Sequence, residues 1–213
     1  FLLVVDNTMI SPIYLKPLEL GADLVVYSIT KFIGGHSDLV AGGVSGSDEL
    51  IEKIKVYRTI FGNVADPDTC WLIQRSLATL ELRIVKQCEN AKKIVSFLKN
   101  HKSVSKIYYP SEGSKNIKIF EEEYSGDGSM ISFEIFGKET ESFEILDKFR
   151  VFKLAVSLGS TESLVQHPSS MTHSDMTKEQ KKRLGISDSL IRLSIGLEDV
   201  DDLLMDLDQA LEI

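Results

Sequence analysis

The strongest constraint on the fold of this chain is a short apolar run that passes directly into a segment of hydroxyl, lysine and glycine residues. Residues 22–27 read Ala-Asp-Leu-Val-Val-Tyr, and residues 28–38 read Ser-Ile-Thr-Lys-Phe-Ile-Gly-Gly-His-Ser-Asp. Such a run, bounded by turn residues, is typical of a buried strand, and strand ends are where open α/β sheets bind ligands. Lys31 is therefore expected at the edge of a sheet, in a position for chemistry.

The residues around Lys31 favour a reactive amine beside an anion site. Burial disfavours an ammonium and leaves the free amine available as a nucleophile toward a carbonyl carbon. Ser28 and Thr30 add hydroxyl donors, and Gly34 with Gly35 lets the backbone approach closely, which suits a phosphate ester. The segment predicts a Schiff base between Lys31 and a phosphorylated aldehyde.

A second apolar run, residues 2–5, ends in the carboxylate of Asp6. Pyridoxal phosphate (PLP) requires an acidic partner for its pyridinium nitrogen, because the protonated nitrogen makes the ring an electron sink. Asp6 fits that role, so the two strand ends together point to PLP.

Two further segments extend the pattern. The first is residues 157–173, which end in His-Pro-Ser-Ser-Met-Thr-His, and the second is residues 191–199, which read Ile-Arg-Leu-Ser-Ile-Gly-Leu-Glu-Asp. Together with residues 5–8 and 28–38, they closely resemble the Cys/Met-metabolism family of PLP enzymes. That family includes cystathionine γ-synthase, cystathionine β- and γ-lyases, methionine γ-lyase and the O-acylhomoserine sulfhydrylases. The resemblance runs from residue 1 to residue 213, and four motifs in one order make a specific signal.

The resemblance implies an α/β fold of the PLP-dependent transferase type, aspartate-aminotransferase-like, fold type I. Residues 1–84 would form the end of the large PLP-binding domain, and residues 85–213 the small C-terminal domain. It also implies a role for each site residue: the cofactor on Lys31, its ring nitrogen on Asp6, its phosphate on Ser28 and Thr30, and the substrate carboxylate on Ser157 and Arg192. Arginine suits that last role because its planar fork grips a carboxylate bidentately while staying charged.

The reaction implied is γ-elimination or γ-replacement on methionine, homocysteine, cystathionine or an O-acylhomoserine. Family members that bind the distal amino group of cystathionine often carry glutamate before the serine, and this chain carries Val156. An apolar residue cannot pair with an ammonium, so a methionine γ-lyase-like activity is preferred over a γ-synthase or a sulfhydrylase. Substrate, regiochemistry, and lyase versus synthase stay open.

A different class of function is a truncated remnant without catalysis that acts as an interaction module. Retention of Asp6, Lys31 and Arg192 argues against decay. A PLP-independent Schiff-base aldolase is disfavoured by Asp6 and by the hydroxyls that flank the lysine.

Composition narrows the partners. The 213 residues are 43% hydrophobic, with a net charge of −8 and a pI near 5.1. This charge argues against nucleic acid and anionic membranes as partners. No apolar stretch approaches the roughly 18 residues that a membrane span requires. Cys70 and Cys88 lie about 27 Å apart if one helix carries both, beyond disulfide reach, which favours reduced thiols in a cytoplasmic protein.

The three histidines near the motifs match no standard metal-ligand spacing, so no metal is expected. His36, with Asp38, is predicted to fix the turn after Lys31. His167 and His173 are predicted to buttress the loop near the substrate carboxylate.

Periodicity and turn residues predict the elements. Strands are expected at 1–5, 23–27, 40–45 and 130–136. Helices are expected at 11–20, 48–56, 116–123 and 199–211, and a further helix follows the strand at 130–136 and ends at residue 149. Between them, a loop is expected at 58–64, and Asp66 with Pro67 should begin one long helix. Its predicted apolar positions are Trp71, Leu72, Leu77, Leu80, Ile84, Cys88, Ala91, Val95 and Leu98.

The chain opens inside an apolar strand without an initiator methionine. Because family members are commonly much longer, we interpret it as the C-terminal half of an enzyme that forms a homotetramer, a dimer of dimers. The phosphate-binding glycine loop, the stacking tyrosine and the segment lent by a neighbouring subunit would then lie outside these residues. On this interpretation the isolated piece binds PLP poorly and is inactive.

Overall fold

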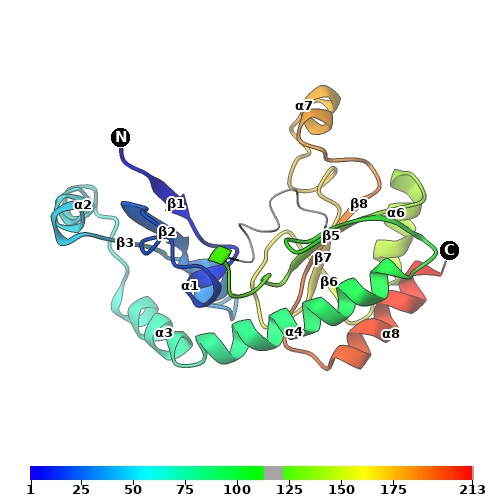
Figure 1. The fold of residues 1–213 in the computed structure, drawn as a ribbon, viewed down its shortest axis with the longest axis horizontal. Helices are drawn as coiled ribbons and strands as arrows, with labels where there is room; N and C mark the ends of the chain where they lie inside the picture. The colour runs from blue at the N-terminus through cyan, green and yellow to red at the C-terminus, as the bar shows by residue number, and fades with distance from the viewer. Residues whose placement is uncertain (113–121, 213) are drawn as a thin grey trace.

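The computed structural model describes residues 1–112 and 122–212, which form two β-sheets joined along one long helix, α4 (Leu80–Lys99) (Figure 1). The first sheet has the order β1-β2-β3 and the second the order β4-β5-β8-β7-β6. The strands are β1 (Val4–Asp6), β2 (Leu24–Ser28), β3 (Gly42–Gly46), β4 (Val104–Tyr108), β5 (Met130–Ile135), β6 (Lys153–Leu154), β7 (Leu164–Gln166) and β8 (Leu190–Ser194).

The helices are α1 (Ser11–Tyr14), α2 (Asp48–Phe61), α3 (Pro67–Leu77), α4, α6 (Glu139–Lys148), α7 (Lys178–Arg183) and α8 (Val200–Leu211). A π-helical turn, η1 (Ile29–Ile33), follows β2 directly. The strands predicted in the first sheet and at 130–136 are confirmed to within a few residues, as are the helices predicted up to 149 and over 199–211. The helix predicted at 116–123 lies mostly outside the described residues.

Two helix predictions in the first 65 residues were wrong. The helix expected over 11–20 ends at Tyr14, and Leu15 is already extended. Pro17 lacks an amide proton, and the residue before a proline avoids the helical region, so the segment cannot continue as a helix. In contrast, α2 runs on to Phe61 through the predicted loop and stops at Gly62, which adopts the left-handed conformation that caps helices.

The long helix predicted from Pro67 is two helices. Asp66 caps α3 by accepting from the Thr69 amide, as predicted, but α3 ends at Leu77 and α4 starts at Leu80. In a continuous helix the Ser76 carbonyl would accept from the Leu80 amide. Here it accepts from Arg83 and from the Thr79 amide instead.

The break separates residues that were predicted to share one helix. Cys70 lies exposed on α3 and Cys88 buried on α4, both as free thiols, so one helix does not carry the pair. Trp71 and Leu77, two of the apolar positions predicted for that helix, are more than half exposed. The predicted domain boundary after residue 84 falls inside α4, which contacts β4 and β5 of the second sheet as well as η1, the turn that follows β2 of the first sheet.

The larger core lies between the second sheet and the helices α4, α6 and α8. Ile131, Phe133 and Ile135 alternate along β5 and are buried among these helices, while the residues between them are only half buried. This alternation is the signature of a sheet covered on one face. The other face of the sheet carries Arg192 on β8, opposite Ser132 on β5.

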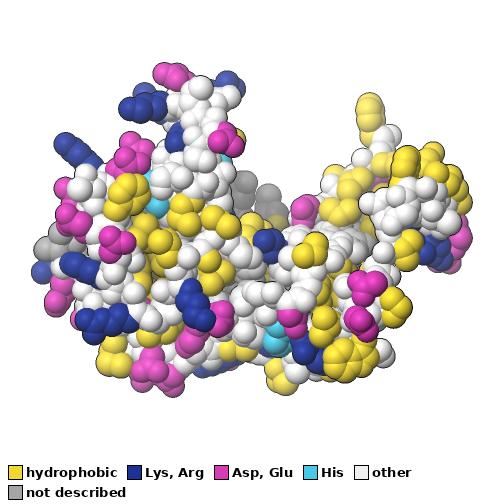
Figure 2. All heavy atoms as spheres, turned by 180° about the vertical axis from the view of Figure 1, so that it is seen from behind, with side chains coloured by type: hydrophobic (Ala, Val, Ile, Leu, Met, Phe, Trp, Pro, Cys, Tyr) yellow, Lys and Arg dark blue, Asp and Glu magenta, His cyan; other side chains and the backbone are white. Residues whose placement is uncertain are grey.

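Apolar side chains gather on the surface around α2, at the edge of the molecule in Figure 2. Val56, Tyr57, Ile60 and Phe61 are each more than half exposed there. Contiguous exposed apolar surface is typical of a contact surface. None of the described helices combines the length and apolarity needed to cross a membrane.

One buried carboxylate fixes the path of the chain into β6. Asp206 on α8 accepts hydrogen bonds from the backbone amides of Arg150, Val151 and Phe152, at 2.8–3.0 Å.

We expect Asp206→Ala to lower the free energy of unfolding by about 3 kcal/mol, because three amides lose a charged acceptor in a buried site. Denaturant titration measures this. Asp202→Ala, on the exposed face of the same helix, is the control and should cost less than about 1 kcal/mol; equal losses would contradict the assignment.

Candidate active site

Lys31 lies in the π-helical turn η1, at the carboxyl end of β2. Its backbone, at φ −87° and ψ −124°, departs from helical geometry inside the turn. The Gly34 amide donates to the Ile29 carbonyl and the Gly35 amide to the Lys31 carbonyl, both at 2.7 Å. Gly35 has φ +70°, a conformation that side chains with a Cβ rarely adopt. The turn is thus closed by its own glycines, and π-helical turns of this kind occur frequently at functional sites.

Asp6 lies at the same sheet edge, because β1 and β2 are parallel and Asp6 is aligned with Val26. The Asp6 carboxylate is exposed and accepts from the Thr8 amide at 2.9 Å. Thr8 in turn accepts from the Ser28 amide at 2.8 Å, which ties the two strand ends together. The carboxylate, the Ser28 hydroxyl and the lysine therefore converge at the carboxyl edge of the first sheet.

The two predicted phosphate ligands differ in availability. The Thr30 hydroxyl donates to the Ala41 carbonyl at 3.2 Å and accepts from the Ala41 amide at 3.0 Å, so its single proton is already used. Within the described residues the Ser28 hydroxyl has no hydrogen-bond partner. Ser28 thus offers a donor to an anion, whereas Thr30 anchors the turn to the segment before β3.

The lysine amine contacts a hydroxyl that comes from the other sheet. Lys31 Nζ donates to Ser157 Oγ at 3.2 Å, and both residues are half buried. Ser157 lies between β6 and β7, 126 positions further along the chain. The two sheets thus meet at this contact.

Arg192 projects from β8 near the same segment. Its Nη2 lies 3.5 Å from the carbonyl oxygen of Val156, the residue before Ser157. Burial lowers the pKa of the Arg192 guanidinium, but from so high an ordinary value that the group stays charged. No carboxylate of the described residues lies within ion-pair distance, so the fork is available to an anionic ligand.

Gly159 brings the Ser157 segment against the lysine turn. It has φ +79°, and a Cβ at this position would lie 2.7 Å from the Phe32 amide nitrogen. Its own amide donates to Ser194 Oγ on β8 at 2.8 Å. Only glycine permits this approach, so Gly159 connects the turn of Lys31 with the strand of Arg192.

Sequence reasoning missed the residues that hold these segments in place. Arg83 donates to the carbonyls of Phe32 and Ile33, directly after the lysine. Gln87 and Asn90 on the same helix also bind loop carbonyls. The signal was present, since these polar residues recur at helical spacing on the buried side of an apolar helix.

The histidines serve local structure. His36 lies 2.7 Å from the Gly34 carbonyl, within the turn. His167 is fully buried, with its two ring nitrogens near Ser170 Oγ and the Asp188 carbonyl. Among the described residues, no group of three metal-ligating side chains is arranged to hold an ion.

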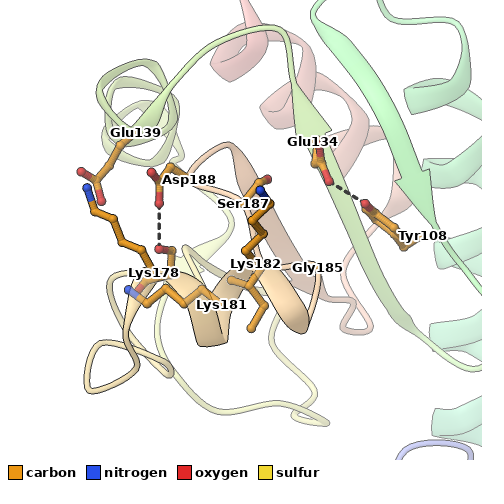
Figure 3. A pocket seen from close by; sticks show the side chains of 11 residues that line it. Tyr108, Glu134, Glu139, Lys178, Lys181, Lys182, Gly185, Ser187 and Asp188 are labelled. Atoms are coloured by element: carbon orange, nitrogen blue, oxygen red, sulfur yellow. Dashed lines mark hydrogen bonds between the residues drawn. The ribbon is translucent and has the colours of Figure 1, made fainter.

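A pocket of about 580 Å³ lies apart from Lys31, and none of the predicted site residues lines it (Figure 3). It is lined by lysines from α7 and by carboxylates from β5, α6 and the loop before β8. Several of these groups are already used inside the protein: Lys181 donates to the Ser169 carbonyl, and Tyr108 to Glu134. We therefore assign the site to the lysine turn.

An amine, an exposed carboxylate and a guanidinium that has no carboxylate partner among the described residues lie on segments that contact one another, which agrees with a match to known proteins. The model of the family described as Cys/Met metabolism PLP-dependent enzyme matches residues 1–212. The chain belongs to this family.

Its relatives carry several activities within the family. The chain is 44% identical over 214 residues to the L-methionine gamma-lyase of Fusobacterium nucleatum subsp. polymorphum, covering 99% of this chain and 54% of the relative. It is 45% identical over 213 residues to the cystathionine gamma-lyase of Bacillus subtilis, covering 99% and 56%. The cystathionine gamma synthase of Xanthomonas oryzae pv. oryzae, solved with aminoacrylate and cysteine, superposes with a TM-score of 0.95 at 43% identity, covering 99% and 55%. The fold predicted from the motifs is confirmed, and the chain spans about half the length of these relatives.

Two glycine-to-alanine variants test whether Gly159 is needed for the close approach of its segment to the lysine turn. In the whole protein, Gly159→Ala introduces a Cβ against the Phe32 amide, so we expect displacement of the turn and loss of most cofactor retention after gel filtration. Gly185→Ala is the matched control, because Gly185 has φ +72° but no atom within 4 Å of an added Cβ. It should cost only the left-handed backbone penalty of about 1 kcal/mol and retain the cofactor. Equal retention by both variants would contradict the packing role of Gly159.

Proposed function

We propose that the whole protein is a PLP-dependent enzyme that performs γ-elimination or γ-replacement on a sulfur amino acid, with Lys31 as the cofactor-linked and proton-transferring residue. The observation that carries the proposal is the 3.2 Å contact between Lys31 Nζ and Ser157 Oγ, beside the guanidinium of Arg192, which has no carboxylate partner among the described residues. An amine and a carboxylate-binding fork at one junction suit an amino-acid substrate.

The residues present fit PLP. Lys31 supplies the amine for its aldehyde, Ser28 a free hydroxyl donor for its phosphate, and Asp6 an exposed carboxylate for its ring nitrogen. Thr30 then supports the phosphate site by fixing the turn, because its hydroxyl proton is used by Ala41. When bound, PLP supplies the electron sink that weakens bonds at the substrate Cα.

The side chains divide the remaining work. Arg192 grips the substrate α-carboxylate, and Ser157 holds the Lys31 amine beside it. The amine, once free, removes the proton at the substrate Cα and then moves a proton at Cβ, so that the γ-substituent can leave. Arg192 contacts the Val156 carbonyl and the Lys31 amine contacts the Ser157 hydroxyl, so the fork and the amine are held against two adjacent residues of one segment.

The substrate that we prefer is methionine, with release of methanethiol, or homocysteine, with release of hydrogen sulfide. The side chain of Val156 is 58% exposed beside Ser157 and offers no charge to a distal ammonium. A γ-synthase or a sulfhydrylase, which would use an activated homoserine, is the alternative. Release of α-keto acid, ammonia and thiol from methionine, homocysteine, cystathionine and O-acylhomoserine separates these activities in one profile.

The assembly that we propose is a homotetramer built from dimers. The exposed apolar side chains of α2 support it, because such a surface is costly to leave in water. The division into a large-domain part (1–84) and a small domain (85–213) is proposed with it. The two sheets support this division, with α4 as the shared element.

Replacement of the lysine tests the central assignment. In the whole protein, Lys31→Ala should abolish the borohydride-reducible cofactor linkage and turnover while leaving the thermal unfolding midpoint close to that of the parent. The exposed Lys53→Ala on α2 is the control and should keep both. Peptide mapping of the reduced protein locates the label, and a labelled lysine elsewhere in the Lys31→Ala variant would refute the assignment.

The fork of Arg192 can be reduced to a point charge by Arg192→Lys. We expect a loss on the order of 2 kcal/mol in amino-acid binding, roughly a 30-fold rise in KM, because one ammonium replaces two parallel hydrogen bonds. Cofactor binding should stay within about twofold of the parent, since Arg192 is assigned to the substrate. An unchanged KM would remove Arg192 from the substrate site.

A further inference from the structure

Three polar side chains form a row along the buried face of α4. Arg83, Gln87 and Asn90 are 4%, 0% and 1% exposed. At about 100° per residue they fall within roughly 60° of one another around the helix, and they span about 10 Å along it. Burying such groups is costly unless each finds a partner, so their partners are informative. We call this set the α4 donor row.

The first member of the donor row holds the lysine turn. Arg83 Nη1 donates to the Phe32 carbonyl at 2.8 Å, and Nη2 to the Ile33 carbonyl at 2.9 Å. These two carbonyls directly follow Lys31. Burial, and secondarily the charge of Arg75, lowers the pKa of the Arg83 guanidinium, and no carboxylate of the described residues pairs with it. Its charge is therefore balanced by backbone dipoles of the turn.

The other two members hold the segments of the substrate-binding residues. Gln87 Nε2 donates to the Ser160 carbonyl at 2.7 Å, just after Ser157. Asn90 Nδ2 donates to the carbonyls of Gly196 and Glu198 at 3.2 and 3.0 Å, just after the strand that carries Arg192. The order along α4 is thus lysine turn, serine segment, arginine strand.

The same three segments are hydrogen-bonded to one another in the same order. The Thr161 amide donates to the Gly35 carbonyl at 2.8 Å, and the Leu197 amide donates to the Thr161 carbonyl at 2.8 Å. A backbone series therefore runs parallel to the donor row. Each segment is therefore held both by its neighbour and by the rigid helix.

We infer that the α4 donor row is the positioning device of the site: it sets the separation between the Lys31 amine, the Ser157 hydroxyl and the Arg192 fork. The inference rests on the proposed function for the roles of those three residues. The members of the donor row touch neither substrate nor cofactor and act through backbone carbonyls. Because each member holds a different segment, each variant has its own signature, which a general loss of stability does not produce.

The experiment uses the whole protein and the variants Arg83→Met, Gln87→Met and Asn90→Leu, with Lys93→Met on the exposed face of α4 as the control. Hydrogen–deuterium exchange without added cofactor is the first readout. We expect exchange to be at least about tenfold faster, confined to residues 32–35 and to the α3–α4 break at 76–80 for Arg83→Met, to 159–161 for Gln87→Met and to 195–198 for Asn90→Leu, since each variant removes the side-chain anchor of those segments. The control should exchange like the parent.

Kinetics with PLP give the second readout. Arg83→Met should slow formation of the reducible linkage and lower kcat by about tenfold with little change in KM, because it frees the lysine turn. Asn90→Leu should raise the amino-acid KM by about tenfold and leave the linkage intact, because it frees the arginine strand. Gln87→Met should change both by smaller factors.

Either of two results would overturn the inference: variants that match the control, or three variants with the same uniform rise in exchange and the same kinetic loss. Should Arg83→Met fail to fold, Arg83→Lys takes its place, since it keeps the charge and loses the fork. The proposed function is judged separately. A parent protein without a reducible linkage at Lys31 would refute that function, while the exchange pattern still decides whether the donor row holds the three segments.

Discussion

The interaction on which the arrangement of the site depends is the buried guanidinium of Arg83 against the carbonyls of the lysine turn. A guanidinium has five N–H donors and no acceptor, so burial away from carboxylates forces it to collect backbone oxygens. It takes the carbonyls of Phe32 and Ile33 on one side and that of Ser76 on the other. One side chain thereby holds the turn and occupies the Ser76 carbonyl at the break between α3 and α4.

The site has a two-sided construction that explains why a long helix is required. The first sheet contributes an amine and a carboxylate at parallel strand ends, and the second contributes a hydroxyl and a guanidinium from a loop and a strand. The contact between Lys31 and Ser157 can form only if the position of one sheet relative to the other is fixed. Because α4 packs on the second sheet and on the lysine turn that follows the first, it is the element suited to keep this position, and its apolar and polar buried residues serve that purpose together.

Hydroxyl groups near the lysine divide between holding structure and offering contacts. Thr8 and Thr30 are used by backbone groups that fix the strand end and the turn, whereas the Ser28 hydroxyl has no partner among the described residues and Ser157 contacts the amine. Residues of the same type that lie a few positions apart thus have different roles, because different backbone groups lie within hydrogen-bond distance of their hydroxyls. In a family with lyase and synthase members, such local differences are where substrate preference is expected to arise.

The sequence by itself determined the family and most of the local elements. A lysine after one apolar run and an aspartate after another predict a PLP site, and the motif around Arg192 resembles that of the family, because strand ends and turn residues are encoded by neighbours in the chain. The caps of α2 and α3 are local as well, although a proline at position 17 outweighed the helical pattern of residues 11–20. Only the tertiary structure decided that Lys31 contacts Ser157, 126 positions away, and that the Thr30 hydroxyl donates its proton to the Ala41 carbonyl. It also decided that Trp71 is exposed and that Arg83, Gln87 and Asn90 donate to backbone carbonyls of distant segments. The physical reason is that a buried polar group takes whichever partner the fold brings to it, and that partner lies far away in the sequence.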